Sequence, residues 1–331
     1  MTSRLENDLF AFTAVRSILK EQAQILLTDL NIISLIQKEP ASLNKICVRS
    51  KVKHKIMLEN ILDFLVGEKI LIFKNKKYSI NKLDTNIPDQ HKRFLEENYA
   101  ESLEWIHFVN QFSKQTLKTG NAPNLTGFEN EKAIFYWDKI MEQSPYSLRE
   151  LAIIELFKNI KENAVVLDYG CGGGIGIEQI IKLSTKDITL FGTDPSKKYF
   201  KKATQRIKKI QPKNKTQERN IKKTTFVPFN KIHELDGEID AIFISIIFNH
   251  IPSKDYIKVF KELKKLLNPE GKLYIVQLLD NEKFQRNPIW VMHNIPTHVG
   301  YPDKNKFISD LNKVFKKVED RLDGIITISA K

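Results

Sequence analysis

Residues 165–176 read Val165-Val166-Leu167-Asp168-Tyr169-Gly170-Cys171-Gly172-Gly173-Gly174-Ile175-Gly176, the most informative segment of the chain. An apolar run, an acidic residue and a glycine-dense turn predict a buried strand followed by a loop that opens a helix. The spacing D-x-G-x-G-x-G differs from the G-x-G-x-x-G of dinucleotide-binding loops, and the Lys-Ser/Thr end of a phosphate loop is missing. Glycines at alternate positions let the backbone come close to a ligand, because they carry no Cβ. The loop is therefore predicted to bind a cofactor.

A second acidic residue follows the next predicted strand, over 188–193, and is Asp194. Open α/β sheets bind ligands beyond the carboxyl ends of their strands, and an acid at this place binds ribose hydroxyls. Asp168 is placed to attract a cationic amine without a metal, so no metal site is expected. A nucleoside with a positively charged tail satisfies both carboxylates, and S-adenosylmethionine is such a molecule. The loop backbone is expected to approach this cofactor at Gly170, Gly172 and Gly174.

With these residues the chain resembles the class I S-adenosylmethionine-dependent methyltransferases. More narrowly, it is similar to the small-molecule O-methyltransferases that carry an N-terminal winged-helix dimerisation domain. Segments along most of the chain carry the resemblance: 117–120, 135–137 and 142–145 for the interdomain helices, and 240–243, 249–252 and 268–273 for the fourth strand, the following helix and the fifth strand. The resemblance implies an α/β fold with a doubly wound, seven-stranded, Rossmann-like sheet, closed by an antiparallel hairpin over 318–322 and 325–329.

Two domains are expected, because 331 residues exceed what one hydrophobic core usually supports. The resemblance implies a winged-helix dimerisation domain over 1–88, interdomain helices over 89–160 and a methyltransferase domain over 161–331. In the first of these, apolar spacing predicts helices over 9–35 and 52–66 and a β-hairpin over 70–80. No apolar run reaches membrane-spanning length and no apolar signal core opens the chain, so a cytoplasmic protein is expected.

The net charge of +13 raises the question of nucleic-acid binding. Twelve Lys and Arg lie between Lys197 and Lys223, with Glu218 as the only acid, on a predicted helix and the loop beyond it. Few aromatic residues that stack on bases accompany them, so a solvated helix face is favoured. Basic residues at 45–55 and 74–77 of the winged helix are compatible with DNA phosphates. The resembled family pairs its subunits through this module, so a homodimer is expected, with DNA binding as the alternative.

Methyl transfer from a sulfonium chiefly needs alignment and exclusion of water, because the methyl group is already activated. A hydroxyl acceptor often needs a base as well, and a placed histidine typically contributes about 10²- to 10⁴-fold. In the resembled O-methyltransferases this base is the histidine of a His-Asp-Trp motif after the fourth strand. Alignment from 240–243 puts Asn249 at the histidine position and His250 at the aspartate position. Asn249 can orient a hydroxyl without taking its proton, and His250 can be the base if the loop shifts by one residue.

The remaining site residues concern adenine and the methyl acceptor. Phe229 is expected to pack on the adenine ring, and Asn230 to accept a hydrogen bond from the adenine amine. The acceptor pocket is expected to be lined by aromatic, thioether and imidazole side chains: Trp137, Trp290, Met292, His293 and His298.

The predicted function is methyl transfer from S-adenosylmethionine to a small molecule, with a hydroxyl of an aromatic or polycyclic metabolite as the expected acceptor. Carbon and nitrogen acceptors stay open because the His-Asp-Trp motif is broken. A nucleic-acid methyltransferase is the first alternative, although residues 249–252 do not match the Asn/Asp-Pro-Pro-aromatic motif of many base-methylating enzymes. The second alternative is a regulator that senses S-adenosylmethionine and binds DNA through its winged helix.

Overall fold

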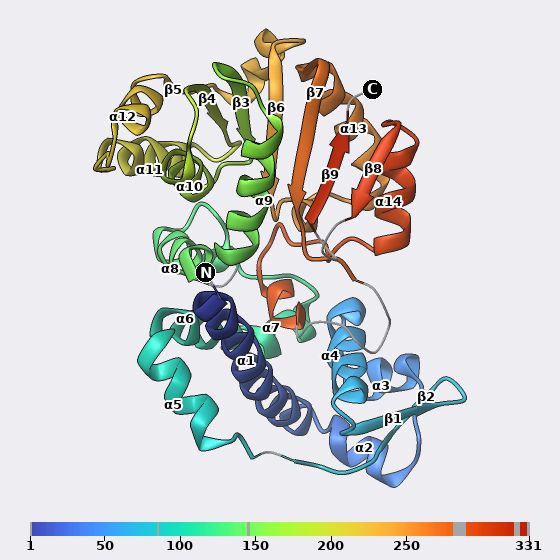
Figure 1. Cartoon of the computed structure of the whole chain (residues 1–331). Helices are drawn as coiled ribbons and strands as arrows, with labels where there is room; N and C mark the ends of the chain where they lie inside the picture. The colour runs from blue at the N-terminus through green and yellow to red at the C-terminus, as the bar shows by residue number, and fades with distance from the viewer. Residues whose placement is uncertain (1, 85, 144–145, 281–288, 321–324, 330–331) are drawn as a thin grey trace. The chain divides into compact units, whose positions relative to one another are not determined.

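Figure 1 shows the computed structural model, which describes residues 2–84, 86–143, 146–280, 289–320 and 325–329. The chain divides into two compact units, of which the first comprises Met1–Ser144 and Asp280–Gly300 and the second Pro145–Leu279 and Tyr301–Lys331. The finer division at residues 88 and 160 stays a prediction. Residues 144–145 and 321–322, which form part of the resemblance, lie outside the described residues.

Helices dominate the first unit. Its elements are α1 (Thr2–Asp29), α2 (Ile32–Lys38), α3 (Leu43–Arg49), α4 (Lys55–Gly67), β1 (Leu71–Lys74), β2 (Lys77–Ile80), α5 (Asp89–Asn98), α6 (Ala100–Asn110), α7 (Ser113–Thr119), η1 (Asn124–Thr126), α8 (Glu131–Gln143) and η5 (Ile289–Asn294). Within the described ranges, no helix of either unit combines the length and apolarity that crossing a membrane requires.

Local conformation explains where the first unit departs from its predicted elements. The helix expected over 9–35 breaks between α1 and α2, since Asn31 has a left-handed φ of 57°, which asparagine tolerates better than most residues. The hairpin predicted over 70–80 is present as β1 and β2. Its turn residues Asn75 and Lys76 have φ of 52° and 58°, as a two-residue type I′ turn requires. The helices and hairpin follow the order that a winged helix needs, and that assignment itself stays a prediction.

The second unit contains the large sheet. Its elements are α9 (Tyr146–Asn159), β3 (Ala164–Tyr169), α10 (Ile175–Leu183), β4 (Ile188–Thr193), α11 (Lys197–Lys208), α12 (Lys215–Lys222), β5 (Thr224–Phe226), η2 (Phe229–Leu235), β6 (Ile239–Ser245), η3 (Phe248–His250), η4 (Ser253–Asp255), α13 (Tyr256–Leu266), β7 (Leu267–Val276), α14 (Lys304–Asn312), β8 (Lys317–Asp320) and β9 (Ile325–Ser329).

Seven strands form one sheet in the order β5-β4-β3-β6-β7-β9-β8 (Figure 1). Strands β3 to β7 pair in parallel, and β9 pairs antiparallel with β7 and β8. Alternate residues face opposite sides: Val166 and Phe243 pack with α9, α10 and α11, whereas Leu167 and Ile242 pack with α13 and α14. Both faces are therefore covered by helices, and the doubly wound, seven-stranded sheet predicted from the sequence is confirmed.

The basic segment 197–223 is more helical than the sequence analysis predicted. Beyond α11, the residues expected to form a loop include the second helix α12. The side chain of Asn214 caps this helix by accepting a hydrogen bond from the Gln217 N–H at 2.9 Å. Asparagine is a favoured capping residue, so the signal was present in the sequence. Arg219 of α12 forms an ion pair with Asp187 at 2.5 Å, so the positive charge of this basic side chain is balanced within the protein.

Candidate functional site

The glycine-rich loop of residues 170–174 joins β3 to α10 and is fixed from two sides. The N–H groups of Gly170 and Cys171 both donate to the carbonyl oxygen of Thr193 at the end of β4, each at 2.9 Å. On the other side, Arg206 of α11 donates through Nε to the carbonyl oxygen of Gly173 at 2.8 Å. The loop is therefore held at the carboxyl edge of the sheet, where open α/β sheets bind ligands.

The loop glycines differ in what surrounds them, although φ is positive at Gly170, Gly172 and Gly174. A Cβ at Gly170 would lie 2.7 Å from Ile247, and one at Gly174 would lie 3.0 Å from Ala203 of α11. These two glycines permit close packing within the protein. A Cβ at Gly172 would meet no atom of the described residues within 4 Å. The backbone at Gly172 therefore borders open space, and a cofactor contact at Gly174 stays a prediction.

Asp168 lies at the end of β3 with 2% of its surface exposed. One carboxylate oxygen accepts a hydrogen bond from the Ile177 N–H, while Oδ2 has no hydrogen-bond partner among the described residues. Burial raises the pKa of Asp168 to about 7, although Arg149 opposes this effect. A cation placed beside Oδ2 would favour the ionised form. Gly176, to which the sequence analysis gave no role, makes room for this carboxylate, because a Cβ there would lie 2.5 Å from Oδ2.

Asp194 follows β4 and faces the same loop. Its Oδ2 accepts a hydrogen bond from the Gly172 N–H at 3.0 Å, and its Oδ1 accepts one from the Ser196 N–H at 2.8 Å. Burial raises the pKa of Asp194, although these two hydrogen bonds lower it. A carboxylate oxygen accepts more than one hydrogen bond, so both oxygens keep capacity for a diol. This geometry is compatible with the predicted ribose contact.

The residues expected to bind adenine lie after β5, next to the end of β3. Phe229 and Asn230 open η2, and both are exposed. The ring of Phe229 lies 5.6 Å from the ring of Tyr169, which directly follows Asp168. The structure therefore brings an exposed aromatic ring to the strand end that carries the predicted amine-binding carboxylate.

The predicted catalytic residues lie beyond the end of β6. Ile246 has φ of 55°, a strained conformation for a β-branched residue, and turns the chain into η3. Asn249 is fully buried, and its Nδ2 donates to Nε2 of His250 at 2.9 Å. Its Oδ1 is without a hydrogen-bond partner in the part of the chain that the structure describes, as is the buried Oγ of Ser245, which sequence reasoning missed. The bond from Asn249 occupies the Nε2 lone pair that His250 would need in order to take up a proton there.

Comparison with known proteins agrees with this geometry. A family model described as a methyltransferase domain matches residues 166–271, from within β3 to within β7. The chain is therefore a methyltransferase. The methyl donor of this methyltransferase is S-adenosylmethionine. No curated protein sequence matches the chain.

Solved structures of other methyltransferases share the fold over nearly the whole chain. The citrinin polyketide synthase CMeT domain is 12% identical, with a TM-score of 0.68, and the match covers 99% of this chain and 95% of that one. The CurJ carbon methyltransferase is 13% identical, with a TM-score of 0.66 and coverage of 99% and 93%. An O-methyltransferase family 2 protein from Planctomyces limnophilus DSM 3776, solved in complex with apigenin, is 11% identical, with a TM-score of 0.56 and coverage of 98% and 95%. At these identities the likeness establishes the fold.

The residues at the sheet edge fit S-adenosylmethionine. The unpartnered Oδ2 of Asp168 suits the ammonium of the cofactor, and the open space beside Gly172 admits its body. Asp194 retains acceptor capacity for the ribose hydroxyls. When bound, the cofactor supplies a methyl group already activated by its sulfonium. The protein's own residues then hold and orient the reactants and exclude water.

All five residues predicted to line the acceptor pocket belong to the first unit, and four of them lie together. Trp290, Met292 and His293 belong to η5, His298 follows it, and all four are buried. The rings of His293 and His298 are 5.1 Å apart. The fifth residue, Trp137 of α8, is half-buried and has ring contacts with Trp105 at 5.8 Å and Phe128 at 6.0 Å.

Two residues around α4 join this histidine group and were missed by the sequence analysis. Asn60 donates through Nδ2 to Nε2 of His293 at 2.7 Å. The ring of His54 lies 5.2 Å from that of His293, and burial lowers the pKa of His54. Because Asn60 and His293 are 233 positions apart in sequence, no local pattern predicts their contact.

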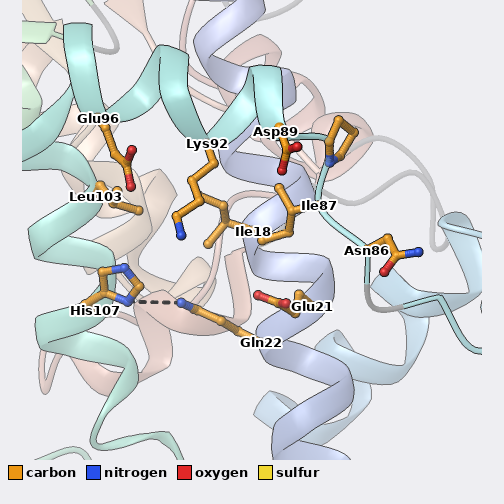
Figure 2. Close-up of a pocket in the computed structure, with 11 residues that line it drawn as sticks. Ile18, Glu21, Gln22, Asn86, Ile87, Asp89, Lys92, Glu96, Leu103 and His107 are labelled. Atoms are coloured by element: carbon orange, nitrogen blue, oxygen red, sulfur yellow. Dashed lines mark hydrogen bonds between the residues drawn. The ribbon is translucent and has the colours of Figure 1, made fainter.

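A separate cavity of about 700 Å³ lies in the first unit between α1, α5 and α6 (Figure 2). Acidic, basic and apolar side chains alternate around it, and Gln22 and His107 approach to 3.3 Å at one end. None of the predicted site residues is among the described residues that line it.

Proposed function

We propose that this methyltransferase acts on a small molecule and transfers the methyl group to a hydroxyl of an aromatic or polycyclic acceptor. The observation that carries the proposal is Oδ1 of Asn249, a buried acceptor atom without a partner among the described residues. Leaving such an atom unsatisfied costs about 1–3 kcal/mol. A hydroxyl that donates to Oδ1 would recover this free energy and would be oriented by the same bond.

An aromatic hydroxyl suits a site with an amide where the resembled enzymes have a base. A phenol has an ordinary pKa of about 10, so it loses its proton more readily than an aliphatic alcohol. Asn249 would then align the oxygen with the methyl carbon, and strong base catalysis would be less necessary. His250 would act as the base only after its Nε2 is released from the hydrogen bond with Asn249.

Methyl-labelled S-adenosylmethionine and a panel of phenols test the proposal, with mass spectrometry and NMR locating the label. We expect label on oxygen, and a roughly 10- to 100-fold lower kcat/KM for Asn249→Ala, the size of one buried hydrogen bond. A smaller loss in His250→Ala supports alignment by Asn249, whereas a loss of about 10²-fold or more identifies His250 as the base. Label on carbon would contradict methylation of a hydroxyl and support a carbon acceptor.

A carbon acceptor is the second candidate, and the residue at position 249 favours it. An enolised carbon nucleophile attacks without needing a histidine at the position that Asn249 occupies. The fold likeness to the CurJ carbon methyltransferase agrees with this candidate. The same labelling experiment distinguishes the two, because a carbon-bound methyl group resists the acid cleavage that removes methyl ethers.

We further propose a cytoplasmic homodimer paired through the first unit. Helix α1 leaves large apolar side chains exposed, with Leu9 at 61%, Phe12 at 41% and Ile25 at 51%, and such residues favour association. Light scattering should give twice the chain mass, and Leu9→Lys with Phe12→Lys should shift the protein toward monomer. Tight, sequence-selective DNA binding in a mobility-shift assay at physiological salt would support the regulator alternative instead.

A further inference from the structure

The positive charge of the chain is concentrated in one segment of the second unit, residues 197–223. Twelve cations and one acid in this segment give a net charge of +11, against +13 for the whole chain. The segment forms α11 and α12, and Figure 1 shows both helices at the end of the sheet where β5 and β4 lie. A solvated face normally mixes charges of both signs, so this concentration calls for a physical explanation.

The two arginines of the segment are engaged within the protein, whereas most of its lysines are not. Arg206 of α11 pairs with Glu178 at 2.8 Å, and Arg219 of α12 pairs with Asp187. The lysine surface, as we name it, consists of six exposed lysines that form no ion pair with any residue in the described ranges: Lys197, Lys201, Lys208, Lys209, Lys213 and Lys215. Their positive charges are therefore open to a partner.

Three residues of the lysine surface form a stripe along α11. At 3.6 residues per turn, positions 197, 201 and 208 fall within roughly 40° of one another around the helix axis. They lie roughly opposite Tyr199 and Ala203, which are buried. The stripe is about 16 Å long, because each residue of an α-helix rises by about 1.5 Å. Helix α11 thus presents a row of three ammonium groups to solvent.

The stripe costs α11 stability, which a surface selected only for solubility would avoid. The sequence of α11 contains no acidic residue, so Lys197 and Lys201 repel each other as like charges four positions apart. Lys197 also lies in the first turn, where the helix dipole disfavours a cation. Acidic residues at the same places would be equally soluble and would stabilise the helix. This cost favours a binding role for the stripe.

We propose that the lysine surface binds an acidic segment of a partner protein. A row of carboxylates matches a row of ammonium groups in charge, and its binding removes the repulsion between Lys197 and Lys201. Lysine is a strongly hydrated point charge on a flexible stem, which suits the rapid, salt-sensitive encounter that complementary charges produce. The inference is independent of the methyl acceptor, because no residue of the lysine surface belongs to the predicted site.

A nucleic acid fits this surface less well than an acidic protein does. Nucleic-acid sites commonly add arginine forks and aromatic stacking to the charge of lysine. Both arginines of the segment, however, pair with carboxylates of the chain itself. Of the aromatic residues on α11, Tyr199 is buried, and Phe200 packs on Phe226 with ring centroids 5.5 Å apart. Helix α11 therefore lacks an exposed ring on which a base could stack.

Fluorescence anisotropy with a labelled polyglutamate peptide of about twelve residues tests the proposal on the full chain. The measurement is made at roughly 50 mM salt, where exposed charges are weakly screened. We expect the triple variant Lys197→Glu, Lys201→Glu and Lys208→Glu to bind the peptide roughly 10-fold more weakly or worse than wild type, because three attractions become repulsions. Circular dichroism checks folding, and the corresponding Lys→Gln triple variant, expected to lose less, serves if the first variant does not fold.

The matched control reverses three exposed lysines of the β1–β2 hairpin in the first unit, with Lys74→Glu, Lys76→Glu and Lys77→Glu. It changes the net charge by the same amount and should alter peptide affinity less than about twofold. Equal weakening by the two triple variants would mean attraction by net charge alone and overturn the proposal, as would wild-type protein that does not bind the peptide. Tighter binding of a single-stranded RNA of equal charge, lost in the α11 variant, would identify a nucleic-acid surface instead.

Discussion

Replacing Asp168 by asparagine should change how the stability of the second unit depends on pH. Burial raises the pKa of this carboxyl from its ordinary 3.8 to about 7 in the folded protein, so between these values the folded chain holds a proton that the unfolded chain has lost. Stability therefore falls as the pH rises through this window. The full shift corresponds to roughly 4 kcal/mol, of which roughly 2.5 kcal/mol develops between pH 5 and pH 8.

Asparagine does not titrate in this range, so the difference between variant and wild type isolates the effect. The free energy of unfolding of Asp168→Asn minus that of wild type should increase by roughly 2.5 kcal/mol from pH 5 to pH 8. Urea denaturation followed by circular dichroism is the assay. Tryptophan fluorescence would report on the first unit, which holds Trp105, Trp137 and Trp290.

A matched control comes from Asp310 of α14. Although burial opposes it, hydrogen bonds from Lys306 and Lys313 lower the pKa of this carboxyl, so it stays ionised from pH 5 to pH 8. Asp310→Asn should therefore differ from wild type by a constant amount across the range. A constant or decreasing difference for Asp168→Asn would refute the assigned environment of Asp168.

The same site leads to three further predictions. S-adenosylhomocysteine should bind roughly 20-fold more tightly at pH 7.5 than at pH 5.5, because Asp168 must lose its proton to hold the ammonium. Calorimetry measures both affinities. An equal pH dependence for 5′-methylthioadenosine, which has no ammonium, would argue against this role of Asp168. Gly174→Ala should destabilise the second unit by roughly 1–3 kcal/mol, because its Cβ meets Ala203 at a left-handed φ. Gly172→Ala should mainly lower cofactor affinity. Thermal unfolding and calorimetry measure the two effects, and a larger loss of stability in Gly172→Ala than in Gly174→Ala would be inconsistent with the loop geometry. Gly176→Ala should displace Asp168 and abolish measurable S-adenosylhomocysteine binding, and wild-type affinity in this variant would place Oδ2 elsewhere.

Local patterns were sufficient to predict the sheet and the cofactor loop. The run before Asp168 and the alternate glycines specify strand, turn and helix within twelve residues, and the parallel strand β6 is apolar along nearly its whole length. Such signals depend on neighbours in sequence, so they can be recognised without a structure. The break at Asn31 and the cap at Asn214 are also local signals. The helical pattern predicted over 9–35 runs across Asn31, whereas Asn214 lies in a segment that is predicted to be a loop.

The missed site residues depend on contacts between distant segments. Arg149 sits in an ordinary helical sequence, where arginine usually faces solvent, and only the packing of α9 on the sheet buries it. Ser245 and Gly176 have no distinguishing sequence context either, and their roles follow from atoms brought near by β3 and α10. The placement of η5 in the first unit likewise depends on long-range contacts with α4, α6 and α7.

A crystal structure with S-adenosylhomocysteine would show whether the cofactor binds at the glycine-rich loop. The ligand should lie at the carboxyl ends of β3 and β4, with its amino group beside Asp168, its sulfur near Gly172 and its ribose hydroxyls on Asp194. Clear density for the ligand at any other part of the chain, with this edge of the sheet empty, would show that Asp168 and Asp194 do not bind the cofactor.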